Sequence, residues 1–258
     1  MKNIKEVNKF MDPYLTESIP VKTHFDWKEL KTIKIKENNE KLISLNMIPE
    51  KIIVSPQYFI QGIKGSLPQC YVREGAYDLL IKAADDLPAG YKFLIYDTWR
   101  PKRVQYDLYN KFEEELKDKY PDKGSSKINK LVEEYVALPS GEKKSPSPHL
   151  TGGAVDLTII DENGKVLDMG TKFDETVKNT HTDYYELILK QRDLTDKEDK
   201  LLKNRRLLYN IMVKAGFTNY PCEWWHFDYG NQVWAYLSQK DHAIYSSTSP
   251  DLRWKKEY

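Results

Sequence analysis

Residues 222–229 read Cys-Glu-Trp-Trp-His-Phe-Asp-Tyr, and their residue types suggest chemistry rather than ordinary core packing. Glu223 and His226 lie three residues apart within four aromatic side chains. A carboxylate and an imidazole in a stiff apolar setting can bind a metal ion or move protons. We therefore take this segment as one half of a catalytic site and look for further polar groups that the rest of the chain brings to it.

A second segment offers such groups. His149 and Asp156 lie seven residues apart, separated by two adjacent glycines that let the backbone bend closely around a site. Zinc hydrolases usually take three ligands from His, Asp and Glu and leave a fourth position for water, whose proton a nearby carboxylate accepts. His149, Asp156 and His226 are the candidate ligands and Glu223 is the candidate base. The pattern indicates a metal hydrolase.

The spacing within the first segment raises a geometrical difficulty. Side chains alternate along a strand, so residues three apart face opposite ways. The aromatic composition of the segment nevertheless favours a strand over a helix. We therefore expect Glu223 at an irregular entrance to a strand and His226 inside it.

Taken singly, most of these residue types have ordinary explanations. A lone His or Asp is more often a hydrogen-bonded structural residue than a ligand, so we expect His24, His181 and His242 to be structural. Asp97 and Arg100 could form a simple ion pair. The coincidence of the two segments, rather than any one residue, supports the metal site.

Composition excludes several classes of function. The 258 residues carry 40 Lys plus Arg against 39 Asp plus Glu, and a formal net charge of +1 gives no reason to expect a nucleic acid or an anionic membrane as partner. Cys70 and Cys222 are the only cysteines, so we expect two free thiols, although one disulfide remains open. There is neither an N-terminal signal-like apolar region nor a stretch of about 20 apolar residues. We expect a soluble, cytoplasmic protein.

Hydrophobic periodicity and turn residues predict the elements that position the site, and together they favour one α+β domain. The expected strands are 51–54, 91–96, 154–160 and 165–169, and the expected helices are 72–87, 101–119, 126–138 and 195–215. An Asn-Gly turn at 163–164 predicts a hairpin between the last two strands, and Thr195 with Glu198 has the form of a capping box. Residues 170–194 are expected to be irregular. Residues 1–38 are expected to be an N-terminal extension of unknown role, and 39–258 to be the catalytic domain.

Five segments between about residues 40 and 230 share a pattern with a known family. They are Ser147-x-His149-x-x-Gly152-x-Ala154-x-Asp156, Glu223-x-Trp225-His226, Tyr96-Asp97-Thr98-Trp99-Arg100-Pro101, Met169-Gly170-x-x-Phe173-Asp174 and Asn204-Arg205-Arg206. The first three resemble the zinc D-Ala-D-Ala metallopeptidases. The last two are similar to segments of the VanX-type D-alanyl-D-alanine dipeptidases within that family.

The resemblance implies one zinc ion per chain, held by His149, Asp156 and His226. It implies that Glu223 is the general base and that Arg100 stabilises the oxyanion of the tetrahedral intermediate. These roles are coherent, because a fixed guanidinium beside a developing negative charge in a dry site contributes several kcal/mol.

The resemblance also bears on substrate and fold. It implies that Asp174 pairs with the free ammonium of the substrate, which restricts such enzymes to dipeptides, and that Ser147 contacts the substrate. It implies a small, mainly antiparallel sheet that carries the zinc site and is flanked by helices. The expected partner is a small peptide, either D-Ala-D-Ala or a peptidoglycan stem peptide. The oligomeric state is not indicated.

Three other functions remain open at this point. A D,D- or L,D-carboxypeptidase would trim stem peptides with the same metal chemistry. A non-catalytic zinc protein that binds the cell wall would need neither Glu223 nor Arg100, so their presence counts against it. A cysteine hydrolase using Cys222 and His226 is weaker still, since no third group is evident to orient the pair.

Overall fold

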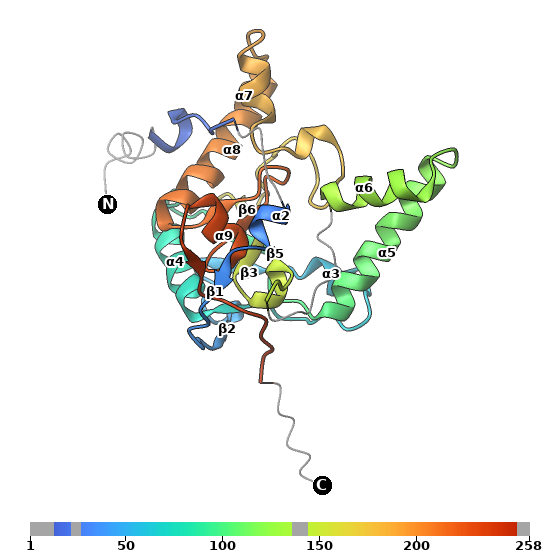
Figure 1. Ribbon diagram of the computed structural model, residues 1–258. Coiled ribbons are helices and arrows are strands. Elements are labelled where there is room, and N and C mark those ends of the chain that lie inside the picture. Colours follow the sequence, from blue (N-terminus) through green and yellow to red (C-terminus); the bar gives the residue numbers. More distant parts are fainter. Residues whose placement is uncertain (1–12, 22–26, 136–143, 252–258) are drawn as a thin grey trace.

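A five-stranded sheet forms the centre of the computed structural model, which describes residues 13–21, 27–135 and 144–251 (Figure 1). Its order is β3 (Ile52–Val54), β5 (Lys92–Asp97), β6 (Ala154–Ile160), β8 (His226–Asp228) and β7 (Thr218–Asn219). The β3 and β5 strands run parallel, and the other neighbours pair antiparallel. The predicted α+β class with a mainly antiparallel sheet is confirmed.

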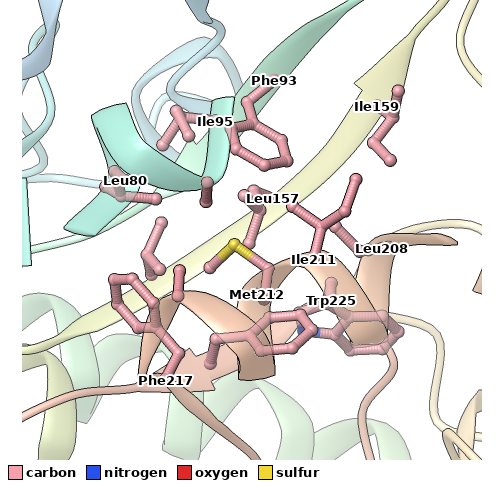
Figure 2. Packing of buried hydrophobic residues seen from close by; sticks show 14 of the residues in the cluster. Leu80, Phe93, Ile95, Leu157, Ile159, Leu208, Ile211, Met212, Phe217 and Trp225 are labelled. Atoms are coloured by element: carbon pink, nitrogen blue, oxygen red, sulfur yellow. The ribbon is translucent and has the colours of Figure 1, made fainter. Parts of the chain in front are cut away.

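Alternation along β6 separates the core from the site. Its odd-numbered residues Val155, Leu157 and Ile159 belong to the main hydrophobic core, together with residues of α4 (Glu74–Asp85) and α8 (Asp196–Ala215). Figure 2 shows Leu157 and Ile159 meeting the side chains of α8. Each buried aliphatic side chain of this kind contributes about 1.5–3 kcal/mol. The even-numbered residues, Asp156 among them, therefore face the other side of the sheet.

The long helix α8 follows its sequence signals closely. Thr195 accepts a hydrogen bond from the backbone N–H of Glu198, and the Glu198 carboxylate accepts one from the backbone of Thr195, so the predicted capping box is present. Gly216 ends the helix with a φ of 120°, a left-handed conformation that favours glycine. The predicted helix over residues 195–215 is confirmed.

Helices α5 (Lys102–Lys119) and α6 (Ser125–Tyr135) project from the body as a pair (Figure 1). They share a small apolar cluster of their own that includes Phe112 and Ile128. Pro101, expected in the first turn of α5, is instead its N-cap residue with an extended backbone, so the helix begins one residue later. The last residues of the predicted second helix, 136–138, lie outside the described part of the chain.

Two predicted elements are wrong in part. The helix expected from residue 72 begins at Glu74, because β4 (Tyr71–Arg73) pairs with β2 (Leu42–Ser44) just before it. The strand expected over 165–169 is reduced to an isolated bridge between Ile160 and Val166. The tight turn does form, with Gly164 at a φ of 77°, but turn chemistry does not determine how far a ladder extends beyond it.

Residues 170–194 are more ordered than predicted. They contain a 3-10 turn, η3 (Lys178–Thr180), and a six-residue helix, α7 (Tyr184–Leu189). A helix of that length spans fewer than two turns, so it leaves almost no apolar period in the sequence.

The described parts of residues 1–38 pack onto the body. Tyr14 and Ile19 are buried in the main core, α2 (Trp27–Leu30) contacts α9 (Gln232–Leu237), and β1 (Lys34–Ile35) pairs with β9 (His242–Ala243). The domain boundary at residue 38 stays a prediction. The remaining short elements are η1 (Leu45–Met47), α3 (Gln57–Ile60) and η2 (Pro148–Thr151).

The structure also bears on the expected free thiols and on the expected lack of a membrane-spanning segment. Cys70 is buried and Cys222 is half-buried, and both are free thiols, as expected. Within the described ranges, no helix combines the length and the apolar character that a bilayer crossing requires.

Candidate metal centre

The register of the sheet places three polar side chains in one row. Asp156 of β6 lies opposite Asp97 of β5 on one side and opposite His226 of β8 on the other. Cross-strand partners point to the same face of a sheet, with Cβ atoms about 4.5–5.5 Å apart. Two of the predicted metal ligands thus meet on the face opposite the core.

His149 comes to this row from η2, immediately before β6. Gly152 ends η2 with a φ of 74°, and a Cβ atom there would lie 2.5 Å from Leu42 Cδ2. A Cβ at Gly153 would lie 2.2 Å from the carbonyl oxygen of Tyr229. Only glycine fits this sharp, tightly packed return, which turns His149 back over the start of β6.

The three predicted ligands form a compact, buried donor set. His149 Nε2 lies 3.3 Å from His226 Nδ1 and 3.5 Å from Asp156 Oδ2, and His226 Nδ1 lies 2.9 Å from Asp156 Oδ1. Zinc bonds to such donors at about 2.0–2.2 Å, so tetrahedral geometry spaces them about 3.3 Å apart. Two imidazoles and one carboxylate at these separations fit one zinc ion.

Hydrogen bonds on the outer side orient both imidazoles. His149 Nδ1 lies 2.7 Å from the carbonyl oxygen of Thr98, and His226 Nε2 lies 3.0 Å from Asp228 Oδ2. Each imidazole that donates there presents its other, unprotonated nitrogen to the cluster. This arrangement of carbonyl or carboxylate behind a ligating histidine is typical of metal sites.

The surroundings shift the pKa values of the two histidines in opposite directions. Burial lowers the pKa of His149 well below the usual range, and the charges of Arg100 and His226 add to the effect. Burial also lowers the pKa of His226, but the carboxylates of Asp228 and Asp156 outweigh it and hold that pKa well above the usual range. The raised pKa of His226 reflects the negative charges of Asp228 and Asp156, which a divalent cation would also compensate.

Glu223 stands at the edge of the cluster. It lies in a turn before β8, where its backbone N–H donates to Tyr220 and its carbonyl accepts from His226, so the expected irregular strand entrance is present. Its Oε2 atom is 3.8 Å from His226 Nδ1. Burial raises the pKa of Glu223 to about 8, opposed by the charge of His226. A bound cation would lower it, which leaves a carboxyl group suited to proton transfer near neutral pH.

Arg100 is held on three sides. Its Nη1 donates to Asp97 Oδ2 at 2.8 Å, its Nε donates to Gln105 Oε1 at 2.8 Å, and its guanidinium carbon lies 5.2 Å from the centre of the Tyr58 ring. Asp97 also lies 3.2 Å from His149 Nδ1, so the expected ion pair with Arg100 extends to a predicted metal ligand. Arg100 lines the same cavity as the three predicted ligands.

The cavity beside the cluster has a volume of about 130 Å³. Arg100, Glu223 and Asp174 line it together with the three predicted ligands, and α5 supplies one wall. Ser147, which was predicted to contact the substrate, is not among the described residues that line the cavity, although its neighbour Pro148 is. Ser147 is buried before η2, so the structure does not bring it to the cavity with the other predicted residues.

Asp174 occupies an unusual backbone position in the loop after Gly170. Its φ is 65°, a left-handed conformation that is costly for most residues and tolerated by aspartate. Desolvation by surrounding protein atoms raises the pKa of Asp174 to about 6, opposed by Arg100. Because the side chain is also exposed to solvent, water limits this rise. The loop thus contributes a second carboxylate to the cavity that Glu223 lines.

Several site residues escaped the sequence analysis. Asp228 carries a usable signal, because it follows His226 by two positions on a strand and so must share its face. The contact of Asp97 with His149 depends on the register of β5 against β6, and the position of Tyr58 depends on how α3 packs against β5. The sequence carries no local sign of either.

Comparisons with known proteins find relatives of this chain. Residues 69–247 match the sequence model of a family described as D-Ala-D-Ala dipeptidase. A D-alanyl-D-alanine dipeptidase of Synechocystis sp. is 30% identical over 208 residues, which cover 71% of this chain and 84% of the relative. One of Escherichia coli is 30% identical over 161 residues, or 62% of this chain and 67% of the relative.

Among solved structures, a vancomycin-resistance D,D-pentapeptidase, VanY, in complex with Zn(II) is similar to this chain. It has 15% sequence identity and a TM-score of 0.41, and the match covers 83% of this chain and 96% of the other.

Proposed function

Because the chain belongs to the D-Ala-D-Ala dipeptidase family, we propose that it is a zinc-dependent dipeptidase that hydrolyses D-Ala-D-Ala. Family membership confirms the resemblance predicted from the sequence and the enzyme class, a zinc peptidase. The observation that carries the finer proposal is that Glu223, Arg100 and Asp174 line the same small cavity as the three-ligand cluster.

The catalytic roles follow from what each group can do. His149, Asp156 and His226 would hold the zinc ion, which would supply the Lewis acidity that lowers the pKa of water and polarises a peptide carbonyl. Glu223 accepts the proton of the attacking water and returns it to the leaving amine. Arg100 is pre-oriented by its neighbours, so it stabilises negative charge on the carbonyl oxygen without reorganising.

Two features support a dipeptide over a longer substrate. Asp174 places a carboxylate where a free ammonium can pair with it, and the acylated nitrogen of a longer peptide lacks that charge. The cavity volume of about 130 Å³ is below the roughly 300–1,000 Å³ of common ligand pockets. We therefore assign Asp174 to the substrate ammonium. The substrate contact predicted for Ser147 is not part of this proposal, because Ser147 does not line the cavity.

The proposed substrate also implies a cellular location for the reaction. D-Ala-D-Ala is a cell-wall precursor made inside the cell, so the proposed reaction belongs in the cytoplasm. Fractionation of cells that express the chain with its own N-terminus would test this location.

The direct test is a substrate comparison with the zinc-loaded protein. We expect hydrolysis of D-Ala-D-Ala and much lower kcat/KM for a peptidoglycan stem pentapeptide. The Glu223→Ala variant should retain zinc and lose hydrolysis, which would exclude a non-catalytic role. Preference for the pentapeptide would replace the dipeptidase by a carboxypeptidase, and a wild type inert on both peptides would favour a binding protein.

A further inference from the structure

Tyr58 is a buried residue of the cavity wall with no role in the reaction proposed above. It comes from the four-residue helix α3 and is 4% exposed. Its ring packs against Phe173, with ring centres 6.0 Å apart, and Phe173 in turn contacts Trp225 at 5.5 Å. Phe173 therefore links the ring of Tyr58 to Trp225, in the segment that contains Glu223.

The hydroxyl of Tyr58 points to Asp174. It lies 3.3 Å from Asp174 Oδ1, a long distance for an O–H···O hydrogen bond, so the contact has room to tighten when a ligand orders the carboxylate. Burial and the charge of Asp174 raise the pKa of Tyr58 well above its usual value, so the hydroxyl stays protonated and donates. A neutral donor orients a carboxylate without cancelling its charge, whereas a lysine or arginine would compete with a cationic ligand.

The ring of Tyr58 contacts Arg100, the other group that the proposed function assigns to the substrate. The guanidinium of Arg100 lies 5.2 Å from the ring centre, within the range of a cation–π contact. Asp97 and Gln105 hold the same guanidinium by hydrogen bonds. One rigid side chain therefore touches both the carboxylate assigned to the substrate ammonium and the cation assigned to the oxyanion.

We propose that Tyr58 is a specificity-determining residue that forms the ammonium subsite with Asp174 and fixes its distance from Arg100. Its hydroxyl binds one oxygen of Asp174, which leaves the other oxygen and the net negative charge for a primary ammonium. Its ring keeps Arg100 at a set separation, so that a ligand anchored at Asp174 presents its first carbonyl to the guanidinium. This inference rests on the proposed function, because it refines how that same site selects a free dipeptide.

The test separates binding from turnover. Equilibrium affinities of D-Ala-D-Ala and N-acetyl-D-Ala-D-Ala are measured calorimetrically on the zinc-loaded Glu223→Ala protein, which cannot consume either ligand. We expect the free dipeptide to bind at least about tenfold more tightly, and we expect the added Tyr58→Phe change to reduce this ratio about tenfold, since it removes a hydrogen bond to a charged group. Tyr96→Phe is the matched control, because Tyr96 also packs on Phe173 and does not line the cavity.

The outcomes are distinct. An unchanged ratio in Tyr58→Phe, an equal loss of affinity for both ligands, or no discrimination before the change would overturn the inference. A lowered unfolding temperature with equal losses would indicate a structural role only. Failure of the wild type to hydrolyse D-Ala-D-Ala would overturn the proposed function instead, while the affinity ratio still decides the role of Tyr58.

Discussion

His226 and Asp228 share one face of β8, and the imidazole Nε2 lies 3.0 Å from the Asp228 carboxylate. Asp228 is fully buried, and its other oxygen accepts a hydrogen bond from Asn231 at 2.6 Å. The carboxylate is thus held from behind and in turn fixes the ring of His226. Its removal would leave the ring free to rotate without touching any of the three predicted ligands.

Asp228→Ala is therefore expected to weaken zinc binding by about 10- to 100-fold, the range seen when the partner behind a ligating histidine is lost. Competition with a chromophoric chelator measures this affinity. Asp199→Ala, which removes an exposed carboxylate on α8, is the control and should leave the affinity unchanged. Equal zinc affinity in the two variants would show that Asp228 does not orient His226.

The three-ligand cluster was predictable because it depends on residue types and on short spacings. His149, Asp156 and His226 stand out in the sequence, and the row they form follows from β6, whose predicted range of 154–160 is confirmed. Asp97 and Tyr58 were not predictable in their site roles. Their contacts depend on strand register and on tertiary packing. Asp97 contacts His149, which lies 52 positions further along the chain, and Tyr58 contacts Asp174, which lies 116 positions further along.

The fold shows the same division between local and non-local information. The caps of α8 are local signals, and they fixed both of its ends correctly. The missing strand at 165–169 and the short strand at 71–73 depend on pairing partners elsewhere in the chain. Local signals therefore predicted the ends of α8, but they did not reveal which strand pairings form at 71–73 and fail to extend at 165–169.

Removal of zinc is expected to destabilise the protein. The carboxylates around the cluster exceed the nearby positive charges, so a divalent cation should bind the folded state alone. Zinc at about 1,000 times its Kd would add about 4 kcal/mol, or about 8–16 °C in unfolding temperature. Thermal unfolding with and without a chelator, followed by zinc add-back, measures the shift. A His149→Ala variant should show no such shift, and an equal shift in it would place the metal elsewhere.

Arg100→Ala is expected to lower kcat by about 10²- to 10³-fold with zinc content unchanged, because it removes one donor to the developing oxyanion. Steady-state kinetics with D-Ala-D-Ala and metal analysis of the same samples check both parts. Arg103→Ala, an exposed arginine on α5, is the matched control and should behave as wild type. If zinc content fell in step with activity, Arg100 would be acting through the metal ligands instead.

Glu37 is expected to stabilise the loop that carries His149, although it lies within residues 1–38. Its carboxylate pairs with Arg73 at 3.0 and 3.1 Å, and the buried Arg73 guanidinium also donates to the carbonyl of Thr151 in η2. Glu37→Ala would leave this buried cation without its carboxylate, at a cost of about 2–3 kcal/mol.

Urea unfolding measures that difference in the free energy of unfolding. Glu113→Ala, which breaks the more exposed pair with Lys117 on α5, should change the stability by less than about 1 kcal/mol. Equal effects of the two changes would mean that the segment around Glu37 does not support the site.

Asp174 is expected to reduce stability while it supports binding. Its pKa of about 6 exceeds the ordinary aspartate value of about 3.9, so the folded state holds this proton more tightly than the unfolded chain does. Stability is therefore lost as the pH rises from about 4 to about 6, and the penalty remains above that window. Because Asp174 is exposed to solvent, the penalty is small.

Asp174→Asn should accordingly be at least as stable as wild type at pH 8, with a smaller difference at pH 5. The same change should lower kcat/KM for D-Ala-D-Ala and abolish the part of its fall below about pH 6 that reflects protonation of Asp174, since an ionised carboxylate is needed to pair with the ammonium. Thermal unfolding and pH profiles measure both effects. Glu175→Gln, in the neighbouring residue of the same cavity wall, is the control and should leave the profile intact. A variant less stable than wild type at pH 8, with an unchanged pH profile, would assign Asp174 to structure rather than to substrate binding.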